Sequence, residues 1–126
     1  SNVTEMNWMF YSCYNLTTLN VSNFDTSNVT NMTAMFDDCR KLTSLDVSNF
    51  DTSKVIYMGG MFEDCSTLTS LNLSNFDTSK VTIIREMFSN CSNLTKIMVG
   101  SKWIINSGTD TTDMFSNCGT QTVTKQ

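Results

Sequence analysis

The amino-acid sequence predicts an α/β solenoid of about five coils, with a parallel sheet on one side and short helices on the other. Cysteines recur at spacings of 26, 26, 26 and 27 residues, and a fixed period of this size is typical of coils that share one rod-like core. Within each coil, an alternating apolar stretch precedes apolar residues spaced by three. We therefore treat residues 1–126 as a single repeat domain, with 100–126 as an atypical C-terminal coil and tail. The repeating cysteines are Cys13, Cys39, Cys65, Cys91 and Cys118.

The first half of each coil predicts a β-strand. Leu45 and Val47 alternate with polar residues, as do their equivalents 26 positions away. Alternation of this kind sends apolar side chains to one face of a sheet and polar side chains to the other. The outward face is the surface that repeat proteins commonly use for binding, so its residues are candidate ligand contacts. They are Thr18, Asn20, Ser44, Asp46, Ser70, Asn72 and Lys96.

A turn follows each strand, with the string Ser-Asn-Phe-Asp-Thr-Ser intact at 22–27, 48–53 and 74–79. We expect its asparagines to satisfy turn backbone groups and its phenylalanines to form an aromatic spine. We expect its aspartates to cap helix starts. Calcium binding is the alternative for the aspartates, although a single carboxylate per coil is a poor calcium ligand set. The residues are Asn23, Asn49 and Asn75; Phe24, Phe50 and Phe76; and Asp25, Asp51 and Asp77.

The second half of each coil predicts a short helix. Val55, Met58, Met61, Phe62 and Cys65 lie at spacings that place them on one helical face. The residues between them are mediocre helix formers, so a looser 3₁₀-rich wall is the alternative. Recurrence of the same apolar residues in each coil favours core packing over a cofactor cavity.

The C-terminal coil departs from the pattern. Trp103, Ile104 and Ile105 stand near the place of the usual turn and are expected to cover the open end of the core. Residues 119–126 show no period and are expected to be frayed or to lead to another domain. The chain also opens inside a repeat, which suggests a fragment of a longer protein.

Composition argues against several classes of function. Eight basic residues against 12 acidic ones give a net charge of −4, which disfavours nucleic-acid binding. The chain has no histidine, so Ser-His-Asp and histidine–zinc sites are excluded within it. No apolar run is long enough to span a membrane. With no glycine-rich phosphate loop either, we expect no enzymatic activity, no cofactor and no metal.

The five cysteines occupy equivalent positions on the apolar face. We interpret them as buried free thiols that act as small hydrophobic residues. A disulfide between adjacent coils and a metal site are the alternatives.

Three aromatic residues break the repeat near its start. Trp8, Tyr11 and Tyr14 are spaced by three, which would place them on one face of the helix expected in the first coil. Such a patch can stack on a sugar or anchor a protein partner. Contact with a preceding coil is the alternative.

The repeat resembles a known family. Leu-x-x-Leu-x-Leu is the leucine-rich-repeat pattern. The string Ser-Asn-Phe-Asp-Thr-Ser-Asn-Val-Thr-Asn-Met-x-x-Met-Phe-x-x-Cys at 22–39 resembles BspA-like leucine-rich repeats, which are also described as a domain of unknown function in mycoplasma lipoprotein-associated and other bacterial surface proteins. The likeness covers residues 1–99 well and 100–118 loosely. It implies a secreted or wall-anchored protein on a bacterial cell surface, and some members are implicated in adhesion.

These observations lead to one functional expectation and one alternative. We expect a non-enzymatic, extracellular adhesion module that binds a host or bacterial protein or glycan through its repetitive polar face. Weak contacts repeated along a rod gain strength through effective concentration. The alternative is a structural stalk that presents another domain.

Overall fold

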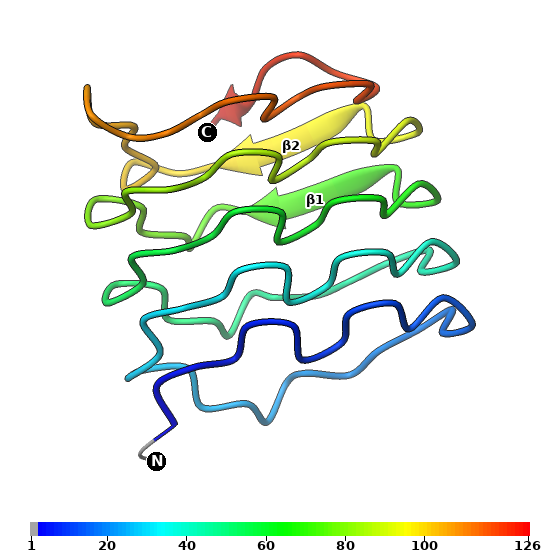
Figure 1. Ribbon diagram of the computed structural model, residues 1–126, viewed down its shortest axis with the longest axis horizontal. Coiled ribbons are helices and arrows are strands. Elements are labelled where there is room, and N and C mark those ends of the chain that lie inside the picture. The colour runs from blue at the N-terminus through cyan, green and yellow to red at the C-terminus, as the bar shows by residue number, and fades with distance from the viewer. Residues whose placement is uncertain (1–2) are drawn as a thin grey trace.

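The computed structural model describes residues 3–126, which wind through coils stacked in chain order from the N-terminal to the C-terminal end (Figure 1). One residue of each coil joins a row of parallel β-bridges that crosses the whole stack. Neighbours in this row are 26 residues apart, except for a final step of 27. The sequence period is therefore the length of one coil. The row runs through Glu5, Asn31, Tyr57, Ile83 and Asp110.

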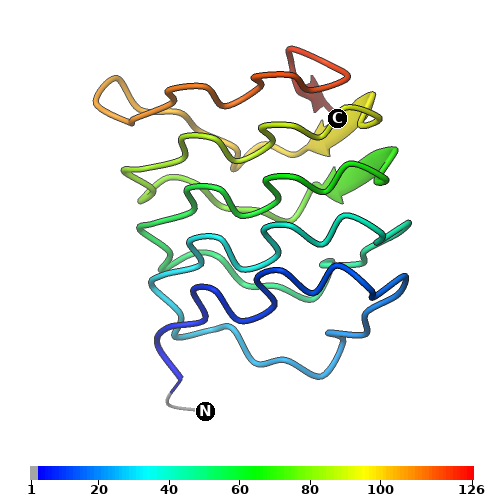
Figure 2. The same ribbon diagram turned by 45° about the vertical axis from the view of Figure 1, so that its right-hand side comes forward.

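One parallel sheet forms on the opposite side of the coils. Its strands are β1 (Ser70–Leu73), β2 (Lys96–Val99) and β3 (Thr124–Lys125), in that spatial order. Leu71 lies opposite Ile97 in register, as the repeat predicted. Figure 2 shows these strands gathered on one side of the stack. The equivalent stretches of the first two coils follow the same path without forming regular strands.

The second half of each coil contains no helix, which overturns part of the predicted fold. No α-helix or 3₁₀-helix occurs within residues 3–126, so the α/β solenoid with short helices is wrong, and so is the 3₁₀ alternative. Overlapping four-residue turns take the place of the helix. In one coil they span 32–35, 34–37 and 36–39, each closed by an N–H···O=C bond of 3.2–3.3 Å.

Left-handed residues explain why a helix cannot form. Ala34 and Asp38 have φ angles of 55° and 65°, and each is the third residue of its turn. A right-handed helix cannot continue through such a residue, whereas a type II turn requires positive φ at this position. The same pair recurs as Gly60 and Asp64 in the next coil. The remaining pairs are Trp8 and Ser12, Glu86 and Asn90, and Asp113 and Asn117.

Backbone donors that a helix would satisfy internally bond instead to the neighbouring coil. The Met32 N–H donates to the Tyr57 carbonyl at 2.8 Å, and the Phe36 N–H donates to the Met61 carbonyl at 2.9 Å. Every second residue of the turn run repeats this bond, while the residues between close the turns. The backbone N–H groups of the turn run are therefore bonded partly within their own coil and partly to the next coil, as burial requires.

The core is a continuous rod whose centre is a stack of phenylalanine rings. Adjacent ring centroids lie 5.6–5.9 Å apart and the rings are nearly parallel, an arrangement that aromatic pairs favour when offset. The predicted spine flanks this stack, because Phe24 contacts Phe10 and Phe50 contacts Phe36. The central stack consists of Phe10, Phe36, Phe62, Phe88 and Phe115.

The aspartates after the strands close local turns. Asp51 Oδ1 accepts the Ser53 N–H at 3.0 Å and the Ser53 hydroxyl at 2.6 Å, and these bonds lower the pKa of Asp51. Asp25 and Asp77 make the same bonds to their own serines. The predicted role as helix caps is wrong because no helix follows.

The repeated spacing of the turn also places polar side chains against the preceding coil. The Asn49 amide donates to the carbonyls of Val21, Ser22 and Phe24 at 3.0–3.3 Å. Asn75 donates in the same way to the coil before it. The prediction that asparagines satisfy turn backbone groups is confirmed at both positions.

The C-terminal residues extend the sheet. β3 pairs with β2, so the prediction of a frayed tail is wrong for residues 124–125. A Cβ at Gly119 would lie 2.5 Å from the Leu94 carbonyl oxygen, which shows how closely the tail backbone approaches the preceding coil. Trp103 is buried as predicted, whereas Ile104 and Ile105 are exposed and do not cover the core.

Candidate functional site

The predicted binding residues of the sheet face are exposed. The side chains of successive coils line up across it, and a hollow of about 420 Å³ lies between Ser44 and Asp46 of one coil and Ser70 and Asn72 of the next. Exposure agrees with the strand pattern, and a binding role stays a prediction. The exposed residues of this face are Thr18, Asn20, Ser44, Asp46, Ser70, Asn72 and Lys96.

Three of these seven residues have a structural role. The side-chain oxygens of Asn20, Asp46 and Asn72 each accept the backbone N–H of the residue two positions later, at 2.9–3.0 Å. The bonds from Ser48 lower the pKa of Asp46. These three side chains therefore close a local turn in each of three successive coils, and the remaining face consists mostly of small polar residues.

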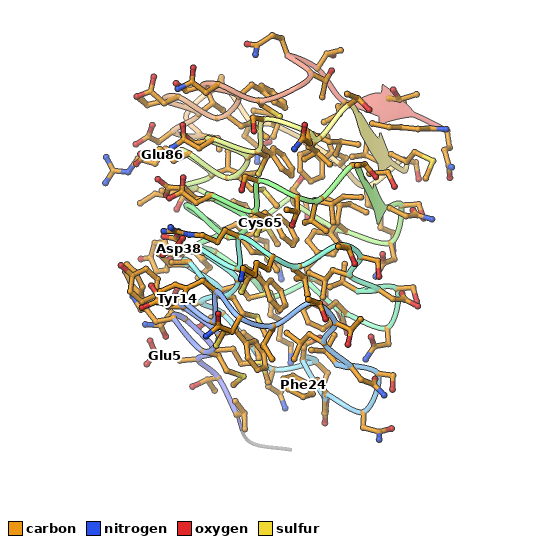
Figure 3. All side chains as sticks on the ribbon, turned by 90° about the vertical axis from the view of Figure 1, so that its right-hand side faces the viewer. Glu5, Tyr14, Phe24, Asp38, Cys65 and Glu86 are labelled. Atoms are coloured by element: carbon orange, nitrogen blue, oxygen red, sulfur yellow. The ribbon has the colours of Figure 1, made fainter. Side chains whose placement is uncertain are left out.

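All three residues of the predicted aromatic patch are exposed, with exposed fractions of 51% for Trp8, 50% for Tyr11 and 48% for Tyr14. Since no helix forms within residues 3–126, their spacing does not place them on one helical face as predicted. Trp8 and Tyr11 pack edge to face with ring centroids 4.9 Å apart. The Arg40 guanidinium of the next coil lies 5.4 Å from the Tyr14 ring centroid, within cation–π range. Figure 3 places Tyr14 on the side opposite the strands, along the same edge as Asp38 and Glu86.

A pocket that sequence reasoning missed lies between the turn runs of neighbouring coils. This turn-side pocket has a volume of about 230 Å³, and carboxylates and aromatic rings line it. Asp37 and Glu63 occupy the same position in successive coils, and Glu86 comes from the coil beyond. Trp8 and Tyr57 also line it, so the aromatic patch and the pocket share a residue.

Two carboxyl groups of the pocket, those of Asp37 and Glu63, have raised pKa values. Burial, with repulsion from Asp64, Asp38 and Glu86, raises the pKa of Asp37 to about 7. Burial, with repulsion from Asp37 and other neighbours, raises the pKa of Glu63 to about 7. Asp37 is only 8% exposed, and its Oδ1 has no hydrogen-bond partner among the described residues.

The cysteines are free thiols in the core, as the repeat predicted. The Cys65 thiol donates to the Phe36 carbonyl at 3.1 Å, and Cys39 and Cys91 make the equivalent bond. Burial raises the pKa of Cys39 to about 11 and that of Cys91 to about 12. Cys13 and Cys118, in the end coils, are partly exposed.

Residues 3–126 contain no group of three or more histidine, cysteine, aspartate or glutamate side chains placed to hold a metal ion. No helix in the same range is long and apolar enough to cross a bilayer.

Comparison with known proteins gives one match. Residues 4–125 match the family described as "Mycoplasma protein of unknown function, DUF285". No curated protein and no solved structure matches the chain. The match extends over nearly all of the coils, including the atypical last one. The chain belongs to this family of mycoplasma proteins, DUF285.

Proposed function

We propose that the chain is a non-enzymatic interaction module on a bacterial cell surface that binds an extracellular protein or glycan. The observation that carries this proposal is the aromatic patch of Trp8, Tyr11 and Tyr14, with each side chain about half exposed. Membership of a mycoplasma family and the likeness of residues 22–39 to BspA-like leucine-rich repeats support a surface location.

The patch has the properties of a contact surface. Exposed tryptophan and tyrosine rings bury large apolar areas on binding and are enriched among residues that dominate interface energies. The edge-to-face contact between Trp8 and Tyr11 and the guanidinium near Tyr14 limit the motion of these rings. Limiting that motion before binding reduces the entropy lost on association. The repeated polar sheet face adds a second surface for weak, multivalent contacts.

A structural stalk is the second candidate, favoured by a different observation. Among the described residues, the seven exposed ones of the sheet face include no aromatic residue. Asn20, Asp46 and Asn72 use their side chains in local turns. A uniform surface of this kind suits a spacer, since tuned protein interfaces are enriched in aromatic residues and arginine.

An array of glycans and extracellular proteins tests both candidates. The chain is probed beside a Trp8→Ala/Tyr11→Ala variant and a Ser44→Arg/Ser70→Arg variant, which replaces exposed residues of the sheet face. Loss of binding only in the aromatic variant supports the patch, and loss only in the arginine variant supports the sheet face. Binding to nothing on the array, by a chain whose circular dichroism shows it folded, refutes the interaction module in favour of the stalk.

A further inference from the structure

The turn-side pocket gathers negative charge around a small volume. Asp37, Glu63 and Glu86 line it from three successive coils. The volume of about 230 Å³ falls below the roughly 300–1,000 Å³ typical of pockets for drug-sized ligands. The pocket therefore suits a single side chain or a small molecule of similar size.

One polar atom of the pocket has no partner. Asp37 is more than nine-tenths buried, and its Oδ1 accepts no hydrogen bond from any described residue. A buried carboxylate oxygen without a donor is costly, and native proteins rarely leave one in that state. In the free protein, Asp37 therefore lacks one hydrogen-bond donor.

The positive charge that would balance these carboxylates is not supplied by the residues that line the pocket. Arg85 also lines it, but its Nη1 lies 3.8 Å from Asp110 Oδ2, in an ion pair outside the carboxylate group. Residues 3–126 bring no three carboxylates close enough together to hold a metal ion, so the pocket favours a cation that does not need three converging ligands.

Apolar and aromatic residues also line the pocket. Ile83 lines it beside the half-exposed rings of Trp8 and Tyr57. Methylene groups gain free energy on contact with such surfaces. An aromatic face also attracts a cation that lies within about 6 Å of its centroid. Carboxylates together with apolar walls match a cation at the end of an alkyl chain.

We propose that the turn-side pocket binds a primary ammonium group on an unbranched alkyl chain, as found in a lysine side chain or a free alkylamine. An ammonium group has only N–H donors and no acceptor, which suits a pocket lined by carboxylates of which one, Asp37, lacks a donor. Its alkyl chain lies against Ile83 and Tyr57, and Trp8 flanks the opening. This site goes beyond the proposed function, because a small amine tests it without any surface partner.

Titration with n-pentylammonium chloride, followed through the Trp8 indole N–H resonance in ¹⁵N-labelled protein, tests the pocket. We expect saturable shifts of this resonance, with the signal of buried Trp103 unchanged. Asp37→Asn/Glu63→Gln should weaken binding at least tenfold. Asp46→Asn, which removes a carboxylate from the sheet face, should leave binding unchanged. Equal binding by the double variant, or equal binding of n-pentanol, overturns the proposal.

Two further arms complete the test. Glu86→Gln is a second pocket variant whose effect can be read if the double variant fails to fold, and unchanged affinity in it overturns the proposal. Calcium chloride that produces the same saturable shifts also overturns it, in favour of an inorganic-cation site. A short lysine-containing peptide that binds more tightly than pentylammonium assigns the ammonium group to a polypeptide, and weaker binding assigns it to a free amine; both results support the pocket.

Discussion

Replacement of Asp37 by asparagine should stabilise the fold at high pH and leave its stability unchanged at low pH. The native protein raises the pKa of Asp37 from 3.8 to about 7. Between these values the folded state binds more protons than the unfolded state, so the free energy of unfolding falls as pH rises. Asparagine carries no charge at any pH and removes this dependence.

The size of the effect follows from the shift. A shift of about three pKa units corresponds to a ceiling of about 4 kcal/mol, at 1.36 kcal/mol per unit. The pocket is open to water, which reduces this value, so we expect a gain of roughly 1–3 kcal/mol at pH 8. For a chain of this length, the gain corresponds to about 4 °C in Tm per kcal/mol.

Urea unfolding followed by tryptophan fluorescence at pH 4 and pH 8 measures the effect, with Asp46→Asn as the matched control. Asp46 is an exposed carboxylate whose position is held by asparagine in the neighbouring coils, and its pKa is lowered. The control should therefore gain no stability at pH 8. A gain in the free energy of unfolding for Asp37→Asn that is equal at the two pH values, or absent at pH 8, refutes the conclusion that burial raises the pKa of Asp37.

Three other predictions concern the core, the tail and the thiols. Phe62→Ala should cost about 3–5 kcal/mol in urea unfolding, because the ring lies in the middle of the stack, and Phe115→Ala in the end coil should cost less; equal costs would contradict a continuous rod. Gly119→Ala should cost about 1–3 kcal/mol, since its Cβ meets the Leu94 carbonyl, whereas Gly108→Ala, with open space around it, should cost far less. Iodoacetamide should modify only the two partly exposed cysteines of the native protein and all five after denaturation, as mass spectrometry would show; rapid modification of a third cysteine in the folded state would argue against the buried row.

Much of the coil arrangement was predictable because a fixed period specifies which residues become neighbours. Leu71 and Ile97 lie in register, the cysteines occupy the core, and Asn49 reaches the preceding coil. Each of these outcomes depends on a type of residue that recurs at the same position in three or more coils. Stacking such residues leaves little freedom in where their side chains lie.

The turn runs that replace the expected helices were not predictable from apolar spacing alone. Apolar residues three positions apart can lie on one face of a helix. The same spacing also occurs in a run of overlapping turns, each of which starts two residues after the one before it. The distinguishing signal lay between the apolar residues: Gly60, Asp64 and Asn90 occupy left-handed positions, which glycine, aspartate and asparagine tolerate best. Ala34 and Glu86 adopt the same backbone without such a preference, which hid the pattern.

The turn-side pocket was harder still to predict. The period places Asp37 beside Glu63, but a helix would have directed both side chains to solvent as ordinary polar spacers. Their burial follows from the turn run, which brings successive coils close enough to exchange backbone hydrogen bonds. A prediction of the pocket therefore requires the backbone conformation first.

The backbone bonds between turn runs bear on how proteins of this design change length. Each coil presents backbone N–H donors and carbonyl acceptors to its neighbour at the same positions of the repeat, as in the bond from Met32 to Tyr57. A tandem duplication of 26 residues would insert a coil that finds complementary partners above and below without any compensating substitution. Deletion of one unit would rejoin matching rows in the same way. Such proteins can therefore gain or lose 26-residue repeats at little structural cost, provided that the terminal coils are retained.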